Sequence, residues 1–157
     1  MFTQAEANSL IALPKKAASD VSFQFPRPGK GLAIPLVSMD DRLSFLLDIG
    51  RGRIRLTKCT YQNRYEQVTI LVRLDLDGPP HTNPSVEAVP LEYLAIHNGA
   101  VVPCPHLHIY VAGFGDRWAI PAPESSFPAT PDLFATLDHF MQYCNVVEPP
   151  VIEKVLF

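Results

Sequence analysis

The sequence has no long apolar run, few cysteines and no excess of positive charge. Arg, Asp, Pro or Gly interrupts every hydrophobic stretch, so none approaches the roughly 18 residues that a membrane-spanning helix needs. The three cysteines, Cys59, Cys104 and Cys144, form no CxxC pair and are odd in number, which favours reduced thiols. The net charge of −3 excludes the overall positive field of a dedicated duplex-DNA-binding protein.

The chain also opens without a positively charged segment followed by an apolar one, the pattern of a secretory signal. With the cysteine usage, this predicts a cytoplasmic protein that does not associate with membranes. The 157 residues are 47% hydrophobic and only 18% charged, enough to bury one sizeable core. We therefore expect a single domain over residues 1–157. The sequence does not determine an oligomeric state.

Both ends of the chain carry helix signals. Thr3 and Glu6 have the spacing of a capping box, which predicts a helix over about 4–13 that Pro14 ends. Thr130-Pro131-Asp132, followed by apolar residues at spacings of three and four, predicts a second helix over about 131–144.

The middle of the chain has the alternating pattern of strands. The expected strands are 20–25, 32–37 at an edge or a bulge because of Pro35, 45–49 with 52–58 as a second or continuing strand, 67–77, a short 91–96, 106–111 and 118–120. Helix, mostly antiparallel strands and helix in that order predict an α+β fold. We expect a twisted, mostly antiparallel sheet with the N-terminal and C-terminal helices packed on one face.

Histidines and aspartates supply the candidate catalytic residues. Strand side chains repeat every two residues, so His106 and His108 share one face of their strand, which we expect to border solvent or a cleft. His81 follows a rigid Gly-Pro-Pro turn after the strand whose polar face carries Arg73, Asp75 and Asp77. If strands 67–77 and 106–111 pair, one cleft is lined by five side chains, those of Asp75, Asp77, His81, His106 and His108; the candidate catalytic residues are Asp75, His81, His106 and His108.

Two chemistries fit such a cleft. Neutral histidines beside a carboxylate act as general base and acid near pH 7, which suits cleavage of RNA without a metal or other cofactor. His81, His106 and His108 could instead hold zinc, with Asp75 as a fourth ligand or as a hydrogen-bonding partner of a ligand, and Cys104 as a further candidate. No CxxC or HExxH spacing supports a closed zinc site, so we expect less than one zinc per chain.

A basic segment is the candidate nucleic-acid site. Arg51, Arg53, Arg55, Lys58 and Arg64 fall within 14 positions that contain no acid. The aromatic and amide side chains between and beside them, from Tyr61 to Tyr65, are typical of proteins that stack and bond the bases of single-stranded RNA. The alternative is that Arg53 and Arg55 are ordinary solvated residues and that 59–65 is a hairpin loop. Arg117 either adds a phosphate-binding guanidinium or stacks on Trp118.

Four blocks resemble an uncharacterised family of small bacterial proteins, a domain of unknown function. They are FLLDIGRGRIRLTKCTYQNR (45–64), VRLDLDGPPHTNP (72–84), CPHLHIYVAGFGDRWAIP (104–121) and DHFMQYCNVVEPP (138–150). The resemblance spans nearly the whole chain, departs from the family pattern in a longer segment 85–102, and implies little about function. The aspartate, the histidine loop and the histidine strand are also similar, more distantly, to small ribonuclease toxins of toxin–antitoxin pairs.

Three functions follow from these observations. The first is an RNA-interacting protein of toxin–antitoxin or defence type, an endoribonuclease that uses histidine acid–base chemistry. The second is a non-enzymatic module that binds a protein partner, such as an antitoxin, in a toxin–antitoxin or phage-defence system. The third is a metal-dependent hydrolase. The apolar tail 151–157 is expected to pack back on the body or to meet a partner chain.

Overall fold

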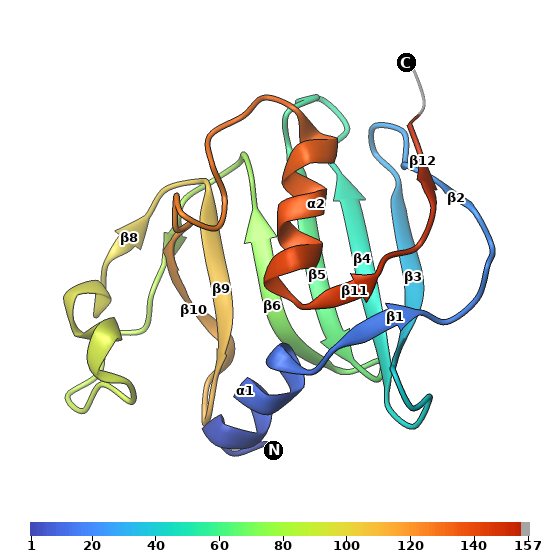
Figure 1. The fold of residues 1–157 in the computed structure, drawn as a ribbon. Coiled ribbons are helices and arrows are strands. Elements are labelled where there is room, and N and C mark those ends of the chain that lie inside the picture. The colour runs from blue at the N-terminus through green and yellow to red at the C-terminus, as the bar shows by residue number, and fades with distance from the viewer. Residues whose placement is uncertain (155–157) are drawn as a thin grey trace.

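The computed structural model describes residues 1–154, which are organised by one large twisted sheet (Figure 1). The sheet has eight strands in the order β10-β9-β6-β5-β4-β3-β1-β11. In chain order they are β1 Lys15–Ala17, β3 Gly31–Ser38, β4 Ser44–Arg51, β5 Cys59–Tyr65, β6 Thr69–Asp75, β9 His106–Val111, β10 Gly115–Pro121 and β11 Val146–Glu148. Each neighbouring pair is antiparallel except β1 and β11, so the predicted α+β fold is confirmed.

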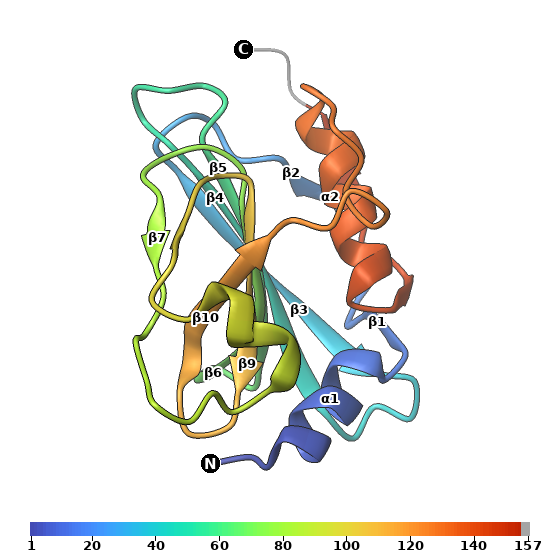
Figure 2. The same ribbon diagram turned by 90° about the vertical axis from the view of Figure 1, so that its left-hand side faces the viewer.

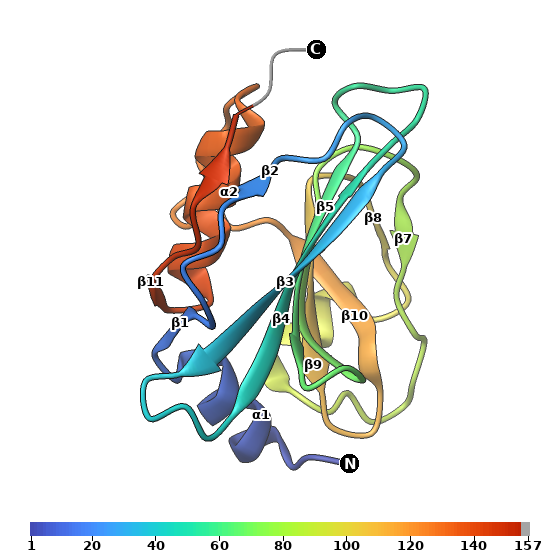
Figure 3. The ribbon, with the colours of Figure 1, turned by 90° about the vertical axis from the view of Figure 1, so that its right-hand side faces the viewer.

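Two helices, one 3₁₀ helix and two small strand pairs complete the fold. They are α1 Gln4–Ala12, α2 Leu133–Tyr143, the 3₁₀ helix η1 Glu92–His97, the pair β2 Phe23–Gln24 with β12 Ile152–Glu153, and the pair β7 His81–Thr82 with β8 Val101–Val102. Helices α1 and α2 lie on one side of the sheet and the β7–β8 pair on the other (Figures 2 and 3). We call these sides the inner and the outer face. Within residues 1–154, no helix is long and apolar enough to cross a membrane.

Local sequence explains where both helices begin. At α1, Thr3 Oγ1 accepts a hydrogen bond from the Glu6 amide and Glu6 Oε2 accepts one from the Thr3 amide, so the predicted capping box is present. At α2 the cap is Asp132, whose carboxylate accepts from the Phe134 amide at 2.9 Å. The prediction of two terminal helices on one sheet face is confirmed.

Strand alternation separates the two faces of the sheet. In β6, Val72 and Leu74 are fully buried in the core, whereas Arg73 and Asp75 lie on the outer face. Tyr61 of β5 pairs with Leu74 and donates its hydroxyl to the Leu133 carbonyl of α2 at 2.6 Å. Much of the hydrophobic core therefore lies between the sheet and α2, and Arg73 and Asp75 point away from it, to the outer face.

Several predicted strands differ from the structure. Residues 52–58 form a turn in which the Gly52 amide donates to the Lys58 carbonyl, and 59–65 is strand β5 instead of a loop. Segment 91–96 falls in a 3₁₀ helix, and the strand expected at 20–25 shortens to β2. These segments lack a regular alternation of apolar and polar residues and do not lie between two paired strands. Turn geometry and packing therefore determine their conformation.

Residues 76–105 leave the end of β6 and return to the start of β9, carrying β7, η1 and β8 across the outer face. We call this segment the excursion. Its anchor is the buried Asn83, whose Nδ2 donates to the carbonyls of His97 (3.1 Å) and Ala119 (2.8 Å), while the Ala119 amide donates to its Oδ1 (2.8 Å). Leu94 of η1 is fully buried and anchors this 3₁₀ helix to the body of the protein. The tail pairs through β12 with β2; residues 155–157 lie outside the described part.

Candidate functional site

Strands β6 and β9 bring the predicted catalytic residues together. The antiparallel register sets Arg73 opposite His108 and Asp75 opposite His106, as expected if the two strands pair. The ring centroids of His106 and His108 are 5.0 Å apart, and that of His81, from β7, is 4.5 Å from His108 and 6.0 Å from His106. We call Asp75, His81, His106 and His108 the histidine cluster.

The two strand histidines are buried, whereas we expected their face to border solvent or a cleft. His106 is 2% and His108 1% exposed. The excursion covers the outer face above β9, and the chain also supplies a partner for each Nδ1. The Nδ1 of His106 lies 3.0 Å from the Val102 carbonyl oxygen, and that of His108 lies 2.9 Å from the Asp116 carbonyl oxygen. Both rings are therefore held in one orientation.

Asp75 lies at the centre of the histidine cluster. Its Oδ2 is 3.1 Å from His106 Nε2, 3.3 Å from His108 Nε2 and 3.3 Å from Arg73 Nε, while Oδ1 accepts from the Thr60 hydroxyl at 2.8 Å. Burial by itself raises the pKa of this carboxyl. Hydrogen bonds from His106 and His108, when these rings carry a proton on Nε2, together with Arg73 and Thr60 outweigh burial and hold the pKa well below its usual range. Asp75 is therefore ionised at neutral pH.

Arg73 connects the histidine cluster to a second carboxylate. Its Nη1 donates to Asp116 Oδ2 at 2.8 Å, and its Nη2 lies 2.8 Å from His108 Nε2. With neutral imidazoles, Asp75, Asp116 and Arg73 carry a net charge of −1. This site therefore favours one additional positive charge.

His81 lies at the rim, and Asp77 lies outside the cluster. His81 Nε2 is 2.8 Å from the Arg117 carbonyl oxygen, and partial burial lowers the pKa of this histidine. Asp77 accepts from the Thr57 hydroxyl and pairs with Arg55 at 3.2 Å. The cleft predicted from five side chains therefore contains Asp75 and the three histidines but not Asp77.

The Cys104 sulfur faces a different ring nitrogen of His106 than Asp75 does, so it does not converge with the other candidate ligand atoms. Its Sγ is 3.7 Å from His106 Nδ1, whereas Asp75 faces Nε2. The converging ligand atoms belong to Asp75, His106 and His108, and all lie within 4.8 Å of one another. A metal set built from this geometry would contain two histidines and one aspartate; the three-histidine alternative is not the converging set.

Part of the predicted basic segment is occupied by internal partners. Arg64 pairs with Asp48 through two hydrogen bonds of 2.6 and 2.8 Å on the outer face. Arg51 donates to the carbonyls of Pro26 and Leu56. These two guanidinium groups hold β4, β5 and the 52–58 turn together.

Arg117 is likewise held by its own loop. It donates to the carbonyls of Phe114 and Gly113 and lies over the Phe114 ring at 5.1 Å; the expected stacking partner, Trp118, is not the ring it covers. Arg53, Arg55 and Lys58 remain on the exposed 52–58 turn, with Arg55 paired to Asp77.

Two of the four residues expected to contact bases, Tyr61 and Asn63, are buried, and the other two, Gln62 and Tyr65, are partly exposed. Tyr61 is fully buried against α2 and Asn63 is 1% exposed, because odd-numbered positions of β5 face the core. Tyr65 packs edge-on against Phe2 and Phe45. Tyr61 and Asn63 are therefore closed to a base, because the 59–65 segment is a central strand with these two side chains in the core.

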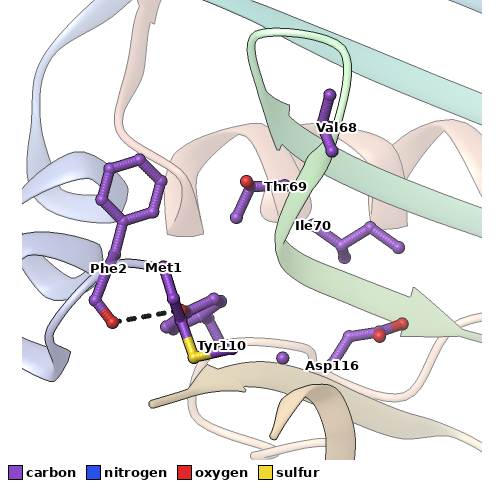
Figure 4. A pocket seen from close by; sticks show the side chains of 8 residues that line it. Met1, Phe2, Val68, Thr69, Ile70, Tyr110 and Asp116 are labelled. Atoms are coloured by element: carbon purple, nitrogen blue, oxygen red, sulfur yellow. Dashed lines mark hydrogen bonds between the residues drawn. The ribbon is translucent and has the colours of Figure 1, made fainter. Parts of the chain in front are cut away.

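Two hollows in the surface border residues that contact the histidine cluster. A cavity of about 410 Å³ includes Asp116, the partner of Arg73, and is walled by Phe2, Ile70 and Tyr110, as Figure 4 shows. A second, of about 450 Å³, lies on the open outer face beside Thr60, whose hydroxyl binds Asp75. Neither hollow is lined by a member of the cluster; each borders a residue, Asp116 or Thr60, that contacts one.

The fold and the site define an α+β protein with a histidine–aspartate cluster set into the covered outer face of its sheet. The chain belongs to a family of unknown function, DUF6978, whose model matches residues 2–146. The resemblance to an uncharacterised family is thereby confirmed, and the match includes every member of the cluster. No curated protein and no solved structure matches the chain.

Proposed function

We propose that this protein binds single-stranded RNA and cleaves its phosphodiester bonds at the histidine cluster. The observation that carries the proposal is the meeting of Arg73, Asp75 and three histidines at one place on the outer face. A guanidinium beside imidazoles supplies the charge stabilisation and the proton transfer that phosphodiester cleavage requires. An RNA target and three free cysteines fit a cytoplasmic location.

The reaction is an internal transfer that consumes no water and no oxidant. The 2′-oxygen bonds to phosphorus while the bond to the 5′-oxygen breaks, which gives a 2′,3′-cyclic phosphate and a free 5′-hydroxyl. One group takes the proton of the 2′-hydroxyl and another delivers a proton to the 5′-oxygen. His81 is the most accessible histidine of the cluster and takes one of these roles, and Arg73 stabilises the charge on the phosphoryl oxygens.

The 52–58 turn supports an anionic substrate because it lies beside the path to the cluster. The Lys58 side chain passes Gly78, where an added Cβ would lie 3.4 Å from Lys58 Cε. Burial raises the pKa of the Cys104 thiol, while the positive charges of Lys58 and Arg55 act in the opposite direction through space. Both cations act through space on Cys104, whose sulfur lies 3.7 Å from His106 Nδ1, and we propose that they hold phosphates near the cluster.

Cleavage of end-labelled single-stranded RNA tests the proposal. We expect His81→Ala and Arg73→Gln each to reduce the cleavage rate at least tenfold, while His139→Ala, on the opposite face of the sheet, leaves it unchanged. Products should end in a 2′,3′-cyclic phosphate. A folded wild-type protein that leaves RNA intact at equimolar concentration contradicts the proposal.

A protein-interaction module is the second candidate, and the excursion carries the observation that favours it. Tyr93, Ile96 and Val101 are 55%, 83% and 61% exposed on this segment, whereas its Leu94 is fully buried. Exposed apolar side chains of this kind are common where a protein partner, such as an antitoxin, binds. Ile96→Asp should abolish such a complex in size-exclusion chromatography and leave RNA cleavage intact.

A further inference from the structure

The protonation of the two buried histidines follows from their Nδ1 partners. A backbone carbonyl oxygen only accepts hydrogen bonds, so the Nδ1 of His106, beside Val102, and the Nδ1 of His108, beside Asp116, each carry a proton. In the neutral ring, the lone pair is then on Nε2. In metal-binding histidines, the nitrogen that does not bind the metal commonly donates to a main-chain oxygen in this way, and this hydrogen bond orients the ring.

Both Nε2 lone pairs face the same carboxylate oxygen. His106 Nε2 is 3.1 Å and His108 Nε2 is 3.3 Å from Asp75 Oδ2, so two neutral acceptors and one anion converge. Such an arrangement is repulsive unless a positive charge lies among the three atoms. Arg73 Nη2 offers a donor to His108, but Asp75 is the partner that His106 Nε2 has among residues 1–154.

The distances suit a metal ion as that positive charge. Two ligand atoms that bind one tetrahedral zinc ion at about 2.0–2.1 Å lie about 3.3 Å from each other. The two nitrogen–oxygen distances of 3.1 and 3.3 Å match this edge, and all three ligand atoms lie within 4.8 Å. The net charge of −1 from Asp75, Asp116 and Arg73 favours a cation at the same point.

We infer that Asp75, His106 and His108 bind one divalent transition-metal ion, such as Zn²⁺. The inference deepens the proposed function by adding an ion to the same site, and it replaces the expectation of a metal-free site. Cys104 is not a ligand because its sulfur faces Nδ1 of His106. Arg73 releases His108 Nε2 when the ion binds and keeps its bond to Asp116.

Because the ligand atoms come from rigid strands, the site needs little rearrangement. His106 and His108 are on β9 and Asp75 is on the neighbouring β6, in fixed register. His81 lies at the rim with its ring centroid 4.5 Å from that of His108. A bound cation supplies Lewis-acid stabilisation to a phosphoryl oxygen.

Metal binding can be measured without RNA. The full-length protein is freed of metal by a chelator and titrated with Zn²⁺ and with Co²⁺ by calorimetry and visible absorption. We expect one equivalent to bind, with a cobalt spectrum typical of mixed nitrogen and oxygen ligands. His106→Ala and the isosteric Asp75→Asn should weaken the affinity more than about tenfold, while the control His139→Ala should bind like the wild type.

The outcomes separate this inference from the proposed function. Absence of saturable binding by the folded wild-type protein, or unchanged affinity in folded His106→Ala and Asp75→Asn, overturns the metal site. If the ion binds at these residues and RNA remains uncut, the metal site stands and the ribonuclease proposal fails. If metal-free protein cleaves RNA as fast as protein saturated with Zn²⁺, the inferred role of the ion in cleavage is wrong.

Discussion

The Nε2 of His106 lies 3.1 Å from the Oδ2 of Asp75, and the other ring nitrogen of His106 faces a backbone carbonyl. A single neutral histidine cannot donate to both oxygens, because it carries one proton. The strand register holds the pair in place, since His106 and Asp75 are directly opposite on β9 and β6. This pair therefore requires an added positive charge, either a second ring proton or a metal ion.

Removing the charges of the 52–58 turn should weaken RNA binding. We expect Arg53→Gln with Lys58→Gln to reduce the slope of log affinity against log salt by about one unit per lost phosphate contact. Fluorescence anisotropy with a labelled single-stranded RNA over a series of salt concentrations measures the slope. An unchanged slope would remove this turn from the RNA site.

Arg64 provides the matched comparison within the same basic segment. Its two hydrogen bonds to Asp48 make it structural, so Arg64→Gln should lower the free energy of unfolding by about 1–2 kcal/mol. RNA affinity should stay the same when the variant is folded. Urea unfolding and the same anisotropy assay distinguish the two effects, and a loss of affinity without a loss of stability would contradict this assignment.

Asn83 should control the order of the excursion. Asn83→Ala removes three buried hydrogen bonds and should cost about 2–3 kcal/mol of unfolding free energy. We expect faster hydrogen exchange over residues 84–102 while α2 stays protected. Asn98→Ala, which loses only exposed bonds to Val86, is the control and should show a smaller change.

Lys15 should make the unfolding free energy of the protein depend on pH. Its Nζ donates to the carbonyls of Ile11, Leu13 and Cys144 at 2.8–2.9 Å, and burial lowers its pKa to about 8. The unfolded pKa is about 10.4, so from about pH 8 to 10 the unfolded chain binds more protons than the folded one. The Lys15 contribution to the unfolding free energy therefore rises with pH in this window and is constant below it.

The difference between wild type and Lys15→Met isolates this contribution. Burial raises the pKa of Cys59 to about 11 and that of Cys144 to about 12, so these thiols lower the stability as the pH rises above the unfolded thiol pKa. We expect the wild-type stability, relative to Lys15→Met, to increase by about 1–3 kcal/mol between pH 7.5 and 10. Urea unfolding at each pH measures it; a constant difference would contradict the assignment.

Cys104 should be the first thiol to react in the native protein. Cys59 and Cys144 are each 1% exposed, whereas Cys104 is only partly buried. With Ellman's reagent we expect one thiol to react in buffer and three in denaturant, and none in buffer for Cys104→Ser. Rapid reaction of two or three thiols in buffer would show that the core opens locally.

The sequence by itself determined the elements whose signals are local. The capping box of Thr3 and Glu6 predicted the start of α1. Strict alternation predicted strand β9, with His106 and His108 on one face. Alternation in β6 likewise put Arg73 and Asp75 on one face of that strand. The α+β class and the meeting of the histidines with Asp75 could be predicted because each depends on short-range periodicity and one strand pairing.

Only the tertiary structure decided what surrounds those residues. The excursion, fixed by Asn83, buries the His106–His108 pair, and the backbone carbonyls of Val102 and Asp116, placed by the fold, determine which nitrogen of each ring carries the proton. Tyr61 packs against α2 in the core, and Arg64 forms an ion pair with Asp48. Burial and charge pairing depend on chain segments brought together by folding, which a pattern of neighbouring residues does not encode.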